Sequence, residues 1–371
     1  MIYVEIKSKK LKGKRIIYAI TGSIACSEAI KIARELRRHG AEIIPVMSRE
    51  ASRVITPYAF EFASGNKPIT ELSGKAEHLI KADLMLIAPC TANTIAKIAN
   101  GIADNAVTTF ALANKKILVA LAMDESMYKN SVVRKNIEKC KNRGILFIEP
   151  KMEEGKAKMA DMEVIVEAVI RAIRKSIDKK LLIIGGNTME AIDSVRAITN
   201  FSSGKMALAL IKEAYERVAS IETWLGNIDC PRFIKNCKKF RNIEELISLI
   251  NNAGKYDAII NCAAISDFIV EKRKGKIESG KELTLKLHPA PRINKMLRNH
   301  AKKLIIFKLD ERKRLIERAK KRMKEDGANY VVANPIENIG SSEGEAYIIG
   351  KKIKKIEGKK EEIAEYVINL I

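Results

Sequence analysis

Residues 183–207 read IIGGNTMEAIDSVRAITNFSSGKMA and join an apolar strand, a glycine turn, a polar loop and the start of a helix. Ile183-Ile184-Gly185-Gly186 is typical of a buried strand that ends at glycines. Ser202-Ser203-Gly204-Lys205 places hydroxyls, backbone N–H groups and an ammonium at a helix N-terminus, which attracts anions. The spacing is equally compatible with an ordinary cap, in which Ser203 caps a helix running through Ala207, Leu210 and Ala214. Either interpretation makes the segment a strand–turn–helix unit of an α/β fold.

The length and the hydrophobic content of the chain indicate two folded domains. The chain has 371 residues, of which 47% are hydrophobic, and roughly 150 residues per domain is the usual allowance. No apolar run approaches the roughly 20 residues of a membrane-spanning helix, and the N-terminal MIYVEIKSKKLKGKR lacks the apolar core of a secretory signal. We therefore expect a cytoplasmic protein without membrane contact.

The cysteine spacing and the charge distribution argue against disulfide-stabilised, zinc-binding and nucleic-acid-binding classes of protein. The six cysteines form no Cys-x-x-Cys pair, so neither a disulfide framework nor a zinc site is indicated, and we expect reduced, mostly buried thiols. They are Cys26, Cys90, Cys140, Cys230, Cys237 and Cys262. The net charge of +23 invites a nucleic-acid role, but Lys and Arg are spread over most expected helices and aromatic residues make up only 5%. We expect no nucleic-acid partner, and interpret the charge as solvated faces that steer small anionic substrates.

Apolar runs of strand length alternate with helical periodicity, first from Arg15 to about Ser176 and again from Leu181. The expected strands are 15–21, 41–47, 83–88, 116–121, 144–148, 181–184, 220–225, 256–261, 303–307 and 330–333, with a hairpin at 346–349 and 352–356. The expected helices are 24–39, 162–176, 243–251 and 310–324, with a terminal helix from Lys359. The charged connector 174–180 places the boundary near residue 178. The pattern predicts two Rossmann-like α/β domains, residues 1–178 and 179–371, each with a buried parallel sheet.

Three small polar turns follow strands of the first domain, in segments 21–26, 46–48 and 88–94. Because open α/β sheets bind ligands at the carboxyl ends of their strands, these turns outline one site. Neither domain contains Gly-x-Gly-x-x-Gly or a Walker lysine motif, which disfavours an ordinary dehydrogenase or a P-loop enzyme.

The second domain carries a long motif, Gly-Gly-x-Thr-x-Glu-x-Ile-Asp-x-Val-Arg-x-Ile-Thr-Asn-x-Ser-Ser-Gly-Lys-Met, over residues 185–206. It resembles the signature of phosphopantothenate–cysteine ligases. The turn 262–268 is similar to that family's Ala-Ala-x-x-Asp-Tyr turn, and Lys276-Ile277 matches its essential lysine. The resemblance implies a doubly wound ligase domain that forms an acyl cytidylate, held by Asn200, and uses Lys276 in the second half-reaction. The substrate- or nucleotide-binding residues that it implies are Ser203, Gly204, Lys205, Ala264, Asp267, Lys276, Pro291, Arg292, Ile293, Phe307 and Arg322.

The first domain resembles the flavin-containing cysteine decarboxylases over residues 15–125, through the three turns, His78-Leu79-Ile80-x-Ala82-Asp83 and Gly101-x-Ala103-Asp104-Asn105. The resemblance implies a flavodoxin-like flavoprotein domain with FMN between subunits of a trimer, His78 as the catalytic histidine and Met123 at the substrate. The implied chemistry is redox-neutral: FMN oxidises the cysteine thiol toward a thioaldehyde, carbon dioxide leaves, and the hydride returns. The implied FMN-binding residues are Gly22, Ser23, Ile24, Ser48, Thr91, Ala92, Asn93 and Thr94.

Two departures from the decarboxylase pattern bear on activity. Leu121-Ala122-Met123-Asp124 replaces the family's Pro-Ala-Met-Asn, so that Asp124 is either protonated in the complex or binds the substrate differently. The family's lid cysteine is absent, and Lys151 stands nearest to its place. We expect Lys151, its pKa lowered by partial burial, or else water or Lys158, to donate the missing proton.

Together the two resemblances imply a bifunctional enzyme of coenzyme A biosynthesis. It would join 4′-phosphopantothenate to L-cysteine with CTP and Mg²⁺, whose ligands are unknown, and decarboxylate the product to 4′-phosphopantetheine. CTP is favoured over ATP by the Ser-Ser-Gly-Lys-Met signature. Fusion of a trimeric half to a dimerising half predicts a homo-oligomer, a dodecamer. The alternatives are a ligase with an inactive flavin half, a flavin prenyltransferase-like first domain, or a non-enzymatic flavin- or nucleic-acid-binding module.

Overall fold

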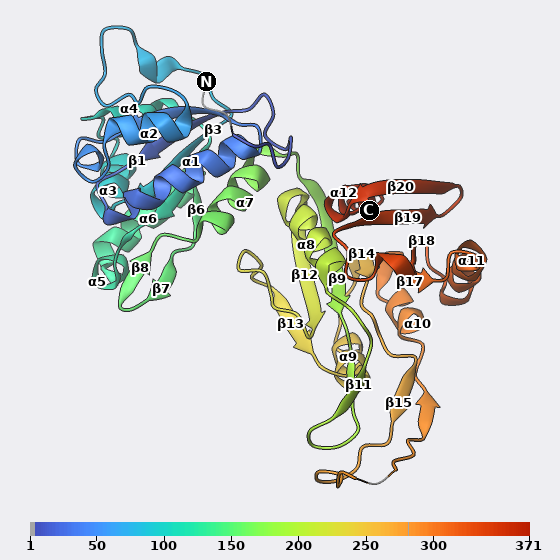
Figure 1. Ribbon diagram of the computed structural model, residues 1–371. Coiled ribbons are helices and arrows are strands. Elements are labelled where there is room, and N and C mark those ends of the chain that lie inside the picture. Colours follow the sequence, from blue (N-terminus) through green and yellow to red (C-terminus); the bar gives the residue numbers. More distant parts are fainter. Residues whose placement is uncertain (1–3, 281) are drawn as a thin grey trace. The chain divides into compact units, whose positions relative to one another are not determined.

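The computed structural model describes residues 4–280 and 282–371 and divides the chain into two compact units between Lys175 and Ser176 (Figure 1). The division falls slightly before the expected boundary at 178. Strand β9 begins at Ile177, whereas a strand had been expected only from Leu181. Each unit is a mixed α/β domain.

The N-terminal unit contains a five-stranded parallel sheet in the order β2-β1-β3-β4-β6. Its strands are β1 (Arg15–Ile20), β2 (Glu42–Met47), β3 (Leu84–Cys90), β4 (Ile117–Leu121) and β6 (Leu146–Ile148). All seven residues of β3 are buried, as a strand covered on both faces requires. The strand order reverses between β1 and β3, which is the flavodoxin-like arrangement and places a binding crevice at the ends of these two strands.

Helices cover both faces of this sheet. The elements are η1 (Ile24–Glu28), α1 (Ala29–Arg38), η2 (Ala51–Arg53), α2 (Pro57–Ser64), η3 (Glu77–Leu79), α3 (Ala92–Asn100), α4 (Ala106–Ala113), α5 (Glu125–Lys129), α6 (Ser131–Asn142) and α7 (Met162–Ile173). Helices α1, α2 and α7 share one apolar cluster with β1, whereas α3, α4 and α6 share the other. The helix expected over 24–39 opens with a 3₁₀ turn, because the Ser23 hydroxyl caps the Ala25 N–H. Full burial of side chains such as Phe60 and Phe110 contributes about 2 kcal/mol each.

A small second sheet, absent from the expectation, stands beside the N-terminal unit's main sheet. It consists of β5 (Met123–Asp124), β8 (Lys156–Lys158) and β7 (Lys151–Glu153), all antiparallel. Ala157 pairs with Met123 and is fully buried, so the β7–β8 hairpin is anchored to the segment that carries Met123 and Asp124.

The C-terminal unit contains an eight-stranded sheet in the order β13-β12-β9-β14-β17-β18-β19-β20. The strands are β9 (Ile177–Gly186), β12 (Val218–Gly226), β13 (Cys237–Phe240), β14 (Tyr256–Asn261), β17 (Ala301–Asp310), β18 (Tyr330–Pro335), β19 (Glu343–Ile349) and β20 (Ile353–Lys359). The first six in the order are parallel, and β19 and β20 form the expected hairpin. The order reverses between β9 and β14, as in a doubly wound Rossmann-like sheet.

The helices of the C-terminal unit again lie on two faces. They are α8 (Lys205–Arg217), α9 (Ile243–Asn251), α10 (Ile293–Arg298), α11 (Leu315–Asp326), α12 (Lys360–Ile368) and the short η4 (Ile336–Asn338). Helices α9, α10 and α11 share one cluster with Leu182 and Ile184, while α8 packs on β9 from the other side together with α12. A Cβ on Gly185 would lie 2.3 Å from that of Ala207, so the glycine permits α8 to approach β9. The helix expected from Asp310 begins only at Leu315, because β17 continues to Asp310.

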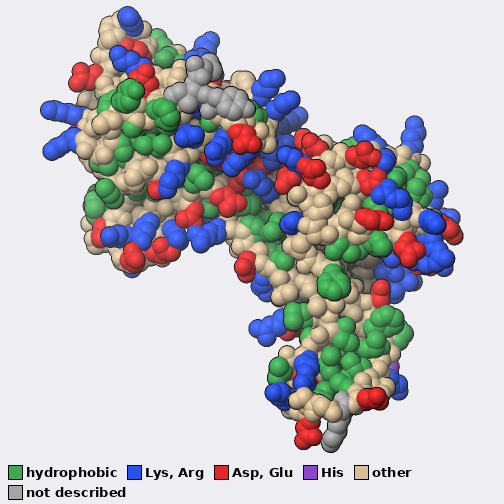
Figure 2. Space-filling model, viewed as in Figure 1, with side chains coloured by type: hydrophobic (Ala, Val, Ile, Leu, Met, Phe, Trp, Pro, Cys, Tyr) green, Lys and Arg blue, Asp and Glu red, His purple; other side chains and the backbone are tan. Residues whose placement is uncertain are grey.

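Two short antiparallel pairs extend away from this sheet as an arm (Figure 1). They are β10 (Met189–Ala191) with β11 (Ala197–Thr199), and β15 (Phe268–Val270) with β16 (Leu287–Pro289). Apolar side chains gather on the arm in Figure 2, and Val195, Phe268 and Leu287 are exposed there.

The expectation that all six cysteines are reduced thiols was wrong for one pair. Cys230 and Cys237 form a disulfide that joins the loop after β12 to the first residue of β13. The other four cysteines are free thiols, three of them buried. Among the described residues, no helix combines the length and apolarity needed to cross a membrane.

Candidate active sites

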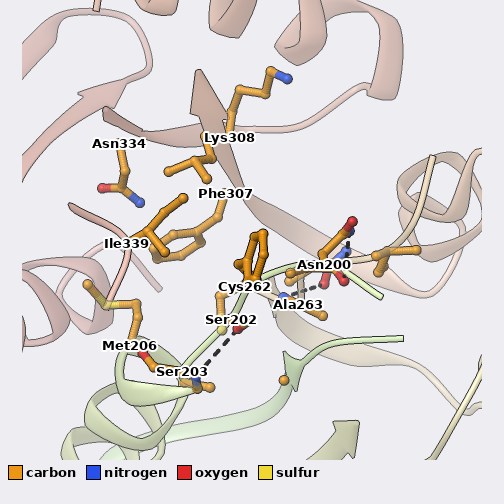
Figure 3. A pocket seen from close by; sticks show the side chains of 18 of the residues that line it. Asn200, Ser202, Ser203, Met206, Cys262, Ala263, Phe307, Lys308, Asn334 and Ile339 are labelled. Carbon is orange, nitrogen blue, oxygen red and sulfur yellow. Dashed lines mark hydrogen bonds between the residues drawn. The ribbon is translucent and has the colours of Figure 1, made fainter. Parts of the chain in front are cut away.

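The C-terminal unit has a cavity of about 540 Å³ at the carboxyl ends of β9, β14 and β17. Figure 3 shows Phe307 beside Ile339, with Asn334 at the same side, and with Met206 of α8 and Ser203 of the turn before α8 facing them. Eleven of the expected ligase residues line it: Asn200, Ser203, Gly204, Lys205, Ala264, Asp267, Pro291, Arg292, Ile293, Phe307 and Arg322. The ligase residues expected from the sequence therefore lie around one cavity, except for Lys276.

The Ser202–Lys205 turn forms one wall of this cavity. Gly204, not Ser203, is the N-cap of α8, and it adopts a left-handed conformation with φ of 68°. The alternative in which Ser203 caps this helix was thus wrong, and the exposed Ser203 hydroxyl has no hydrogen-bond partner among the described residues. A Cβ on Gly204 would lie 2.6 Å from Ile228 Cγ2, so glycine is required by both conformation and space. The first turn of α8 therefore presents N–H groups and the Lys205 ammonium to an anion.

Asn200 is held between the turns that follow β9 and β14. Its Nδ2 donates to the Ala264 carbonyl at 3.3 Å, and its own carbonyl accepts from Asn187 Nδ2 at 3.3 Å. Asn187 also donates to the Thr199 hydroxyl at 2.6 Å. These bonds fix the Asn200 amide at the sheet's switch point, where it lines the cavity.

A second set of cations reaches the cavity from the opposite face of the sheet. Arg292 precedes α10 and Arg322 lies on α11. Both contact the buried Asp326, Arg292 at 2.7 Å and Arg322 at 2.7 Å. The hydrogen bonds that Arg292 donates to the Asp326 and Glu325 carboxylates raise its pKa. The two guanidinium groups are therefore oriented by one carboxylate before any ligand binds.

Lys276 lies outside this cavity, on an exposed loop. The loop is tied to residues 193–196: Ile277 N–H donates to Asp193 at 3.1 Å, and Arg196 donates to the Ile277 carbonyl at 3.1 Å. Backbone hydrogen bonds from Val195, Ile277 and Arg196 hold the pKa of Asp193 well below its usual range. Asp193 is thus a charged anchor for the loop that carries Lys276.

Sequence reasoning missed several lining residues of the same cavity. Lys308 and Asn334 lie near the ends of β17 and β18. The strand pattern located these two strands but did not identify the two side chains as site residues. Lys360 and the 338–340 segment come from the last part of the chain, and no motif marks them. Asn334 Oδ1 is buried without a hydrogen-bond partner among the described residues.

The N-terminal unit has a cavity of about 750 Å³ at the carboxyl ends of β1, β2 and β3. The expected residues that line it are Gly22, Ser23, Ser48, Thr91, Ala92, Asn93, Thr94 and Met123. Ile24 and Asp124 instead line an adjoining groove of about 550 Å³, which shares Ser23 and Met123 with the first cavity. Arg49, Lys97 and Asp104 are lining residues that the turn pattern did not identify.

Hydrogen bonds lock the turns of the N-terminal cavity together. Thr91 N–H donates to the Thr21 hydroxyl at 3.0 Å, and the Thr91 hydroxyl caps α3 by accepting from Thr94 N–H. A Cβ on Gly22 would lie 2.3 Å from Glu50 Cβ, so the backbone passes close to the turn after β2. The hydroxyls, backbone N–H groups and helix start match what a phosphate ester requires, and the volume admits an attached ring system.

The adjoining groove contains the first of the two departures, Asp124, but not Lys151. Asp124 accepts from Ser126 N–H at 2.9 Å and from the Ser126 hydroxyl at 2.6 Å, and these bonds lower its pKa. The free protein therefore carries Asp124 as a carboxylate. Lys151 is half-buried and pairs with Glu153 at 2.6 Å, and it lines neither cavity. Lys158, by contrast, lines the groove.

His78 lies on η3 and is partly buried, but it does not line either cavity of its own unit. The exposed Leu79 follows it. No group of three or more His, Cys, Asp or Glu side chains that could hold a metal ion occurs within residues 4–280 and 282–371.

The folds define a two-domain α/β protein, with a flavodoxin-like unit followed by a Rossmann-like unit, each with a cavity at the carboxyl ends of its strands. Residues 4–174 match the Flavoprotein family, and residues 176–371 match the DNA/pantothenate metabolism flavoprotein C-terminal domain. The chain belongs to the family of coenzyme A biosynthesis bifunctional proteins CoaBC. It is similar to the CoaBC proteins of Thermococcus kodakarensis, with 43% identity over 94% of this chain and 92% of the relative, and of Methanocaldococcus jannaschii, with 41% over 98% and 95%.

Among solved structures, the N-terminal part resembles the FMN-dependent cysteine decarboxylase SpaF, with 27% identity and a TM-score of 0.41 over 44% of this chain and 99% of that one. Family membership over nearly the whole chain makes this protein a bifunctional enzyme of coenzyme A biosynthesis. Its activities are those of a phosphopantothenate–cysteine ligase and a phosphopantothenoylcysteine decarboxylase.

Proposed function

We propose that the ligase activity runs through CTP in the C-terminal cavity. The carboxylate of 4′-phosphopantothenate attacks the α-phosphorus of CTP, forming an acyl cytidylate and releasing pyrophosphate. The amine of L-cysteine then attacks the acyl carbon, forming the amide and releasing CMP. The observation that carries this proposal is the convergence of Asn200, the α8 turn and Arg292 on one cavity of about 540 Å³.

Each wall of the cavity has a role in this scheme. The Ser203–Lys205 turn and the pair Arg292 and Arg322 supply cations and N–H groups for phosphates from opposite faces of the sheet. Phe307 and Ile293 offer apolar surface to the nucleotide, and Asp267 lies at the same cavity for the ribose. Asn200 and the Ala264 turn hold the acyl group. Lys276 acts in the second half-reaction from a separate, anchored loop.

Mg²⁺ has no complete protein site among the residues that the structure describes. The ion is proposed to enter as part of the substrate, on the triphosphate oxygens that Mg²⁺ prefers.

We propose FMN as the cofactor of the N-terminal cavity. The turns at Gly22–Ser23, Ser48 and Thr91–Thr94 would hold it, with its phosphate at the N–H groups of the helix starts. When bound, FMN supplies reversible oxidation of the cysteine thiol, which makes loss of carbon dioxide possible. Met123 and Asp124 orient the substrate in the adjoining groove, where Lys158 supplies an ammonium. Because Asp124 is ionised, it accepts a hydrogen bond from the substrate rather than pairing with its carboxylate.

The proposed assembly explains why His78 and Lys276 lie apart from the cavities of their own chain. A trimer of N-terminal units would bring His78 of one copy to the flavin of another, and would cover Ile24 and Leu79, which are 82% and 68% exposed. Pairing of the apolar arms would join C-terminal units as dimers and give a dodecamer. The isolated segment 1–178 should then sediment as a yellow trimer, and a yellow monomer would count against this assembly. A cytoplasmic location stays a prediction.

The decisive experiment follows both products with purified protein, 4′-phosphopantothenate, L-cysteine, CTP and magnesium. We expect release of pyrophosphate and of carbon dioxide. Pyrophosphate without carbon dioxide would select the ligase with an inactive flavin half. His78→Asn should stop only the carbon dioxide release, and Lys276→Gln should form the acyl cytidylate without its capture by cysteine. Normal amide formation by Lys276→Gln would contradict the role given to that loop.

A further inference from the structure

Lys360 lies at the first position of α12 and lines the ligase cavity. Helix α12 packs along α8, which itself begins at Lys205. The first residues of two neighbouring helices therefore bring two ammonium groups to one end of the cavity. No motif in the sequence links these two lysines, which come from opposite ends of the C-terminal unit.

The segment between η4 and β19 joins these two helix starts. Lys205 Nζ donates to the Gly340 carbonyl at 2.7 Å, and the Lys360 N–H donates to the Ser342 carbonyl at 3.1 Å. Gly340 and Gly344 line the same end of the cavity. This end is thus a defined wall, built by two helices and the segment that bridges them.

The Lys360 ammonium has no hydrogen-bond or ion-pair partner in the described part of the chain. Partial burial and then the positive charge of Lys205 lower its pKa, while the Glu361 carboxylate acts in the opposite direction. Two cations that repel one another beside a cavity are stabilised by an anion placed between them. An anionic ligand is therefore the partner that this wall lacks.

The two arginines at the opposite wall of the cavity already have carboxylate partners. Arg292 and Arg322 share the Asp326 carboxylate, and Arg292 also contacts Glu325 at 2.9 Å. Arg292 immediately precedes α10 and Arg322 lies on α11, and these two helices pack on the sheet face opposite to α8. The cavity therefore has two separate cationic ends, one paired with carboxylates and one not.

We propose that Lys205 and Lys360 together bind a phosphate group at the α8 and α12 end of the ligase cavity, as a second anion site apart from Arg292 and Arg322. This inference rests on the ligase function proposed above. The ligand is a phosphate ester, either the 4′-phosphate of phosphopantothenate or a phosphate of the nucleotide. Two cationic ends suit a reaction whose first step joins two phosphorylated molecules.

The test uses the full chain and initial rates of pyrophosphate release, with each substrate varied in turn while the other is saturating. Lys360→Gln should raise the KM of one phosphorylated substrate about tenfold or more, because a charge-assisted hydrogen bond is lost. The substrate whose KM rises identifies the phosphate that is bound. Lys360→Arg should restore most of the affinity. Lys351→Gln, in the turn between β19 and β20, is the matched control and should change neither KM.

The proposal is wrong if Lys360→Gln changes the KM of neither substrate, or if Lys360→Gln and Lys360→Arg raise a KM equally. An inactive wild-type chain in the same assay would instead count against the ligase function. The unmodified chain gives a second measurement that no folding defect can disturb: acetylation by an amine-reactive reagent, mapped by mass spectrometry. CTP or 4′-phosphopantothenate should protect Lys360 and not Lys351, and unprotected Lys360 with both substrates would again reject the site.

Discussion

Arg322 and Asp326 lie one turn apart on α11 and form an ion pair, with 2.7 Å between Arg322 Nε and Asp326 Oδ2. The same buried carboxylate accepts from Arg292 at 2.7 Å and from Asn294 Nδ2 at 2.9 Å. One buried carboxylate therefore orients two arginines of the cavity.

Asp326→Asn should therefore weaken nucleotide binding through both arginines. We expect the KM for CTP to rise several-fold and the stability of the C-terminal unit to fall by about 2 kcal/mol, since a buried charge-assisted network is broken. Steady-state kinetics and urea unfolding measure the two effects. Glu325→Gln is the control, because Glu325 is more exposed and contacts only Arg292 of the two arginines. Equal effects of the two substitutions would contradict a special role for Asp326.

Asp193 should position Lys276 for the second half-reaction. Asp193→Ala removes the acceptor for Ile277 N–H and the partner of Arg196, so the Lys276 loop loses its anchor. We expect the acyl cytidylate to form at a near-normal rate while its capture by cysteine slows, as in Lys276→Gln. Quenched-flow measurement of the two half-reactions checks this. A loss of both half-reactions in parallel would indicate general unfolding.

The ionisation of Asp193 also gives a pH expectation. Because its folded pKa is depressed below the ordinary aspartate value near 3.9, its stabilising contribution is fully present above that value and is lost only as the pH falls further. The rate of amide formation from preformed acyl cytidylate should therefore show no Asp193-dependent change between about pH 5 and pH 8. A wild-type transition in that window that disappears in Asp193→Asn would refute this assignment.

Lys158, rather than Lys151, is the hairpin lysine expected to influence decarboxylation. Lys158 lines the groove beside Asp124, and its pKa is raised by its hydrogen bond to Glu154, so it carries a full charge at neutral pH. Lys151 is held by Glu153 outside the groove. Lys158→Met should slow carbon dioxide release at least several-fold, whereas Lys151→Met should leave it nearly unchanged. The reverse order would restore Lys151 as the proton donor considered from the sequence.

Much of the fold could be predicted from the sequence, because buried parallel strands appear in it as continuous apolar runs. Both domains, the hairpin after β18 and the terminal helix were found in this way. Part of the ligase cavity was accessible too, since several of its residues follow strand ends or lie in the contiguous 185–206 motif. These features depend on local pattern, which a single sequence displays.

The remaining features depend on contacts between segments that are far apart in the chain. The arm strands have three residues each, too few for a period to be visible. Lys360 reaches the cavity only because α12 packs on α8. The positions of His78 and Lys276, outside the cavities of their own chain, have no sequence signal at all. Such placements follow from tertiary packing rather than from local propensity.

The Cys230–Cys237 disulfide closes a short loop near the ligase cavity, since Ile228, which lies just before Cys230, packs against the cavity-lining Gly204. In the chain-entropy description, a loop of this length stabilises the folded state by about 2 kcal/mol. Unfolded, unreduced protein should titrate with four thiols, the free cysteines Cys26, Cys90, Cys140 and Cys262, and should gain two more on reduction. Six thiols before reduction would show that the bond does not form.

The same bond should set the stability of the C-terminal unit. The only tryptophan, Trp224, is fully buried in β12, so its fluorescence reports on this unit alone. Cys230→Ser should lower the urea midpoint of the Trp224 transition, and reductant should lower the wild-type midpoint to the same value. Reductant should have no further effect on the variant, which is the internal control. If reductant leaves the wild-type midpoint unchanged although the thiol count rises from four to six, then the disulfide closes the loop without stabilising the fold.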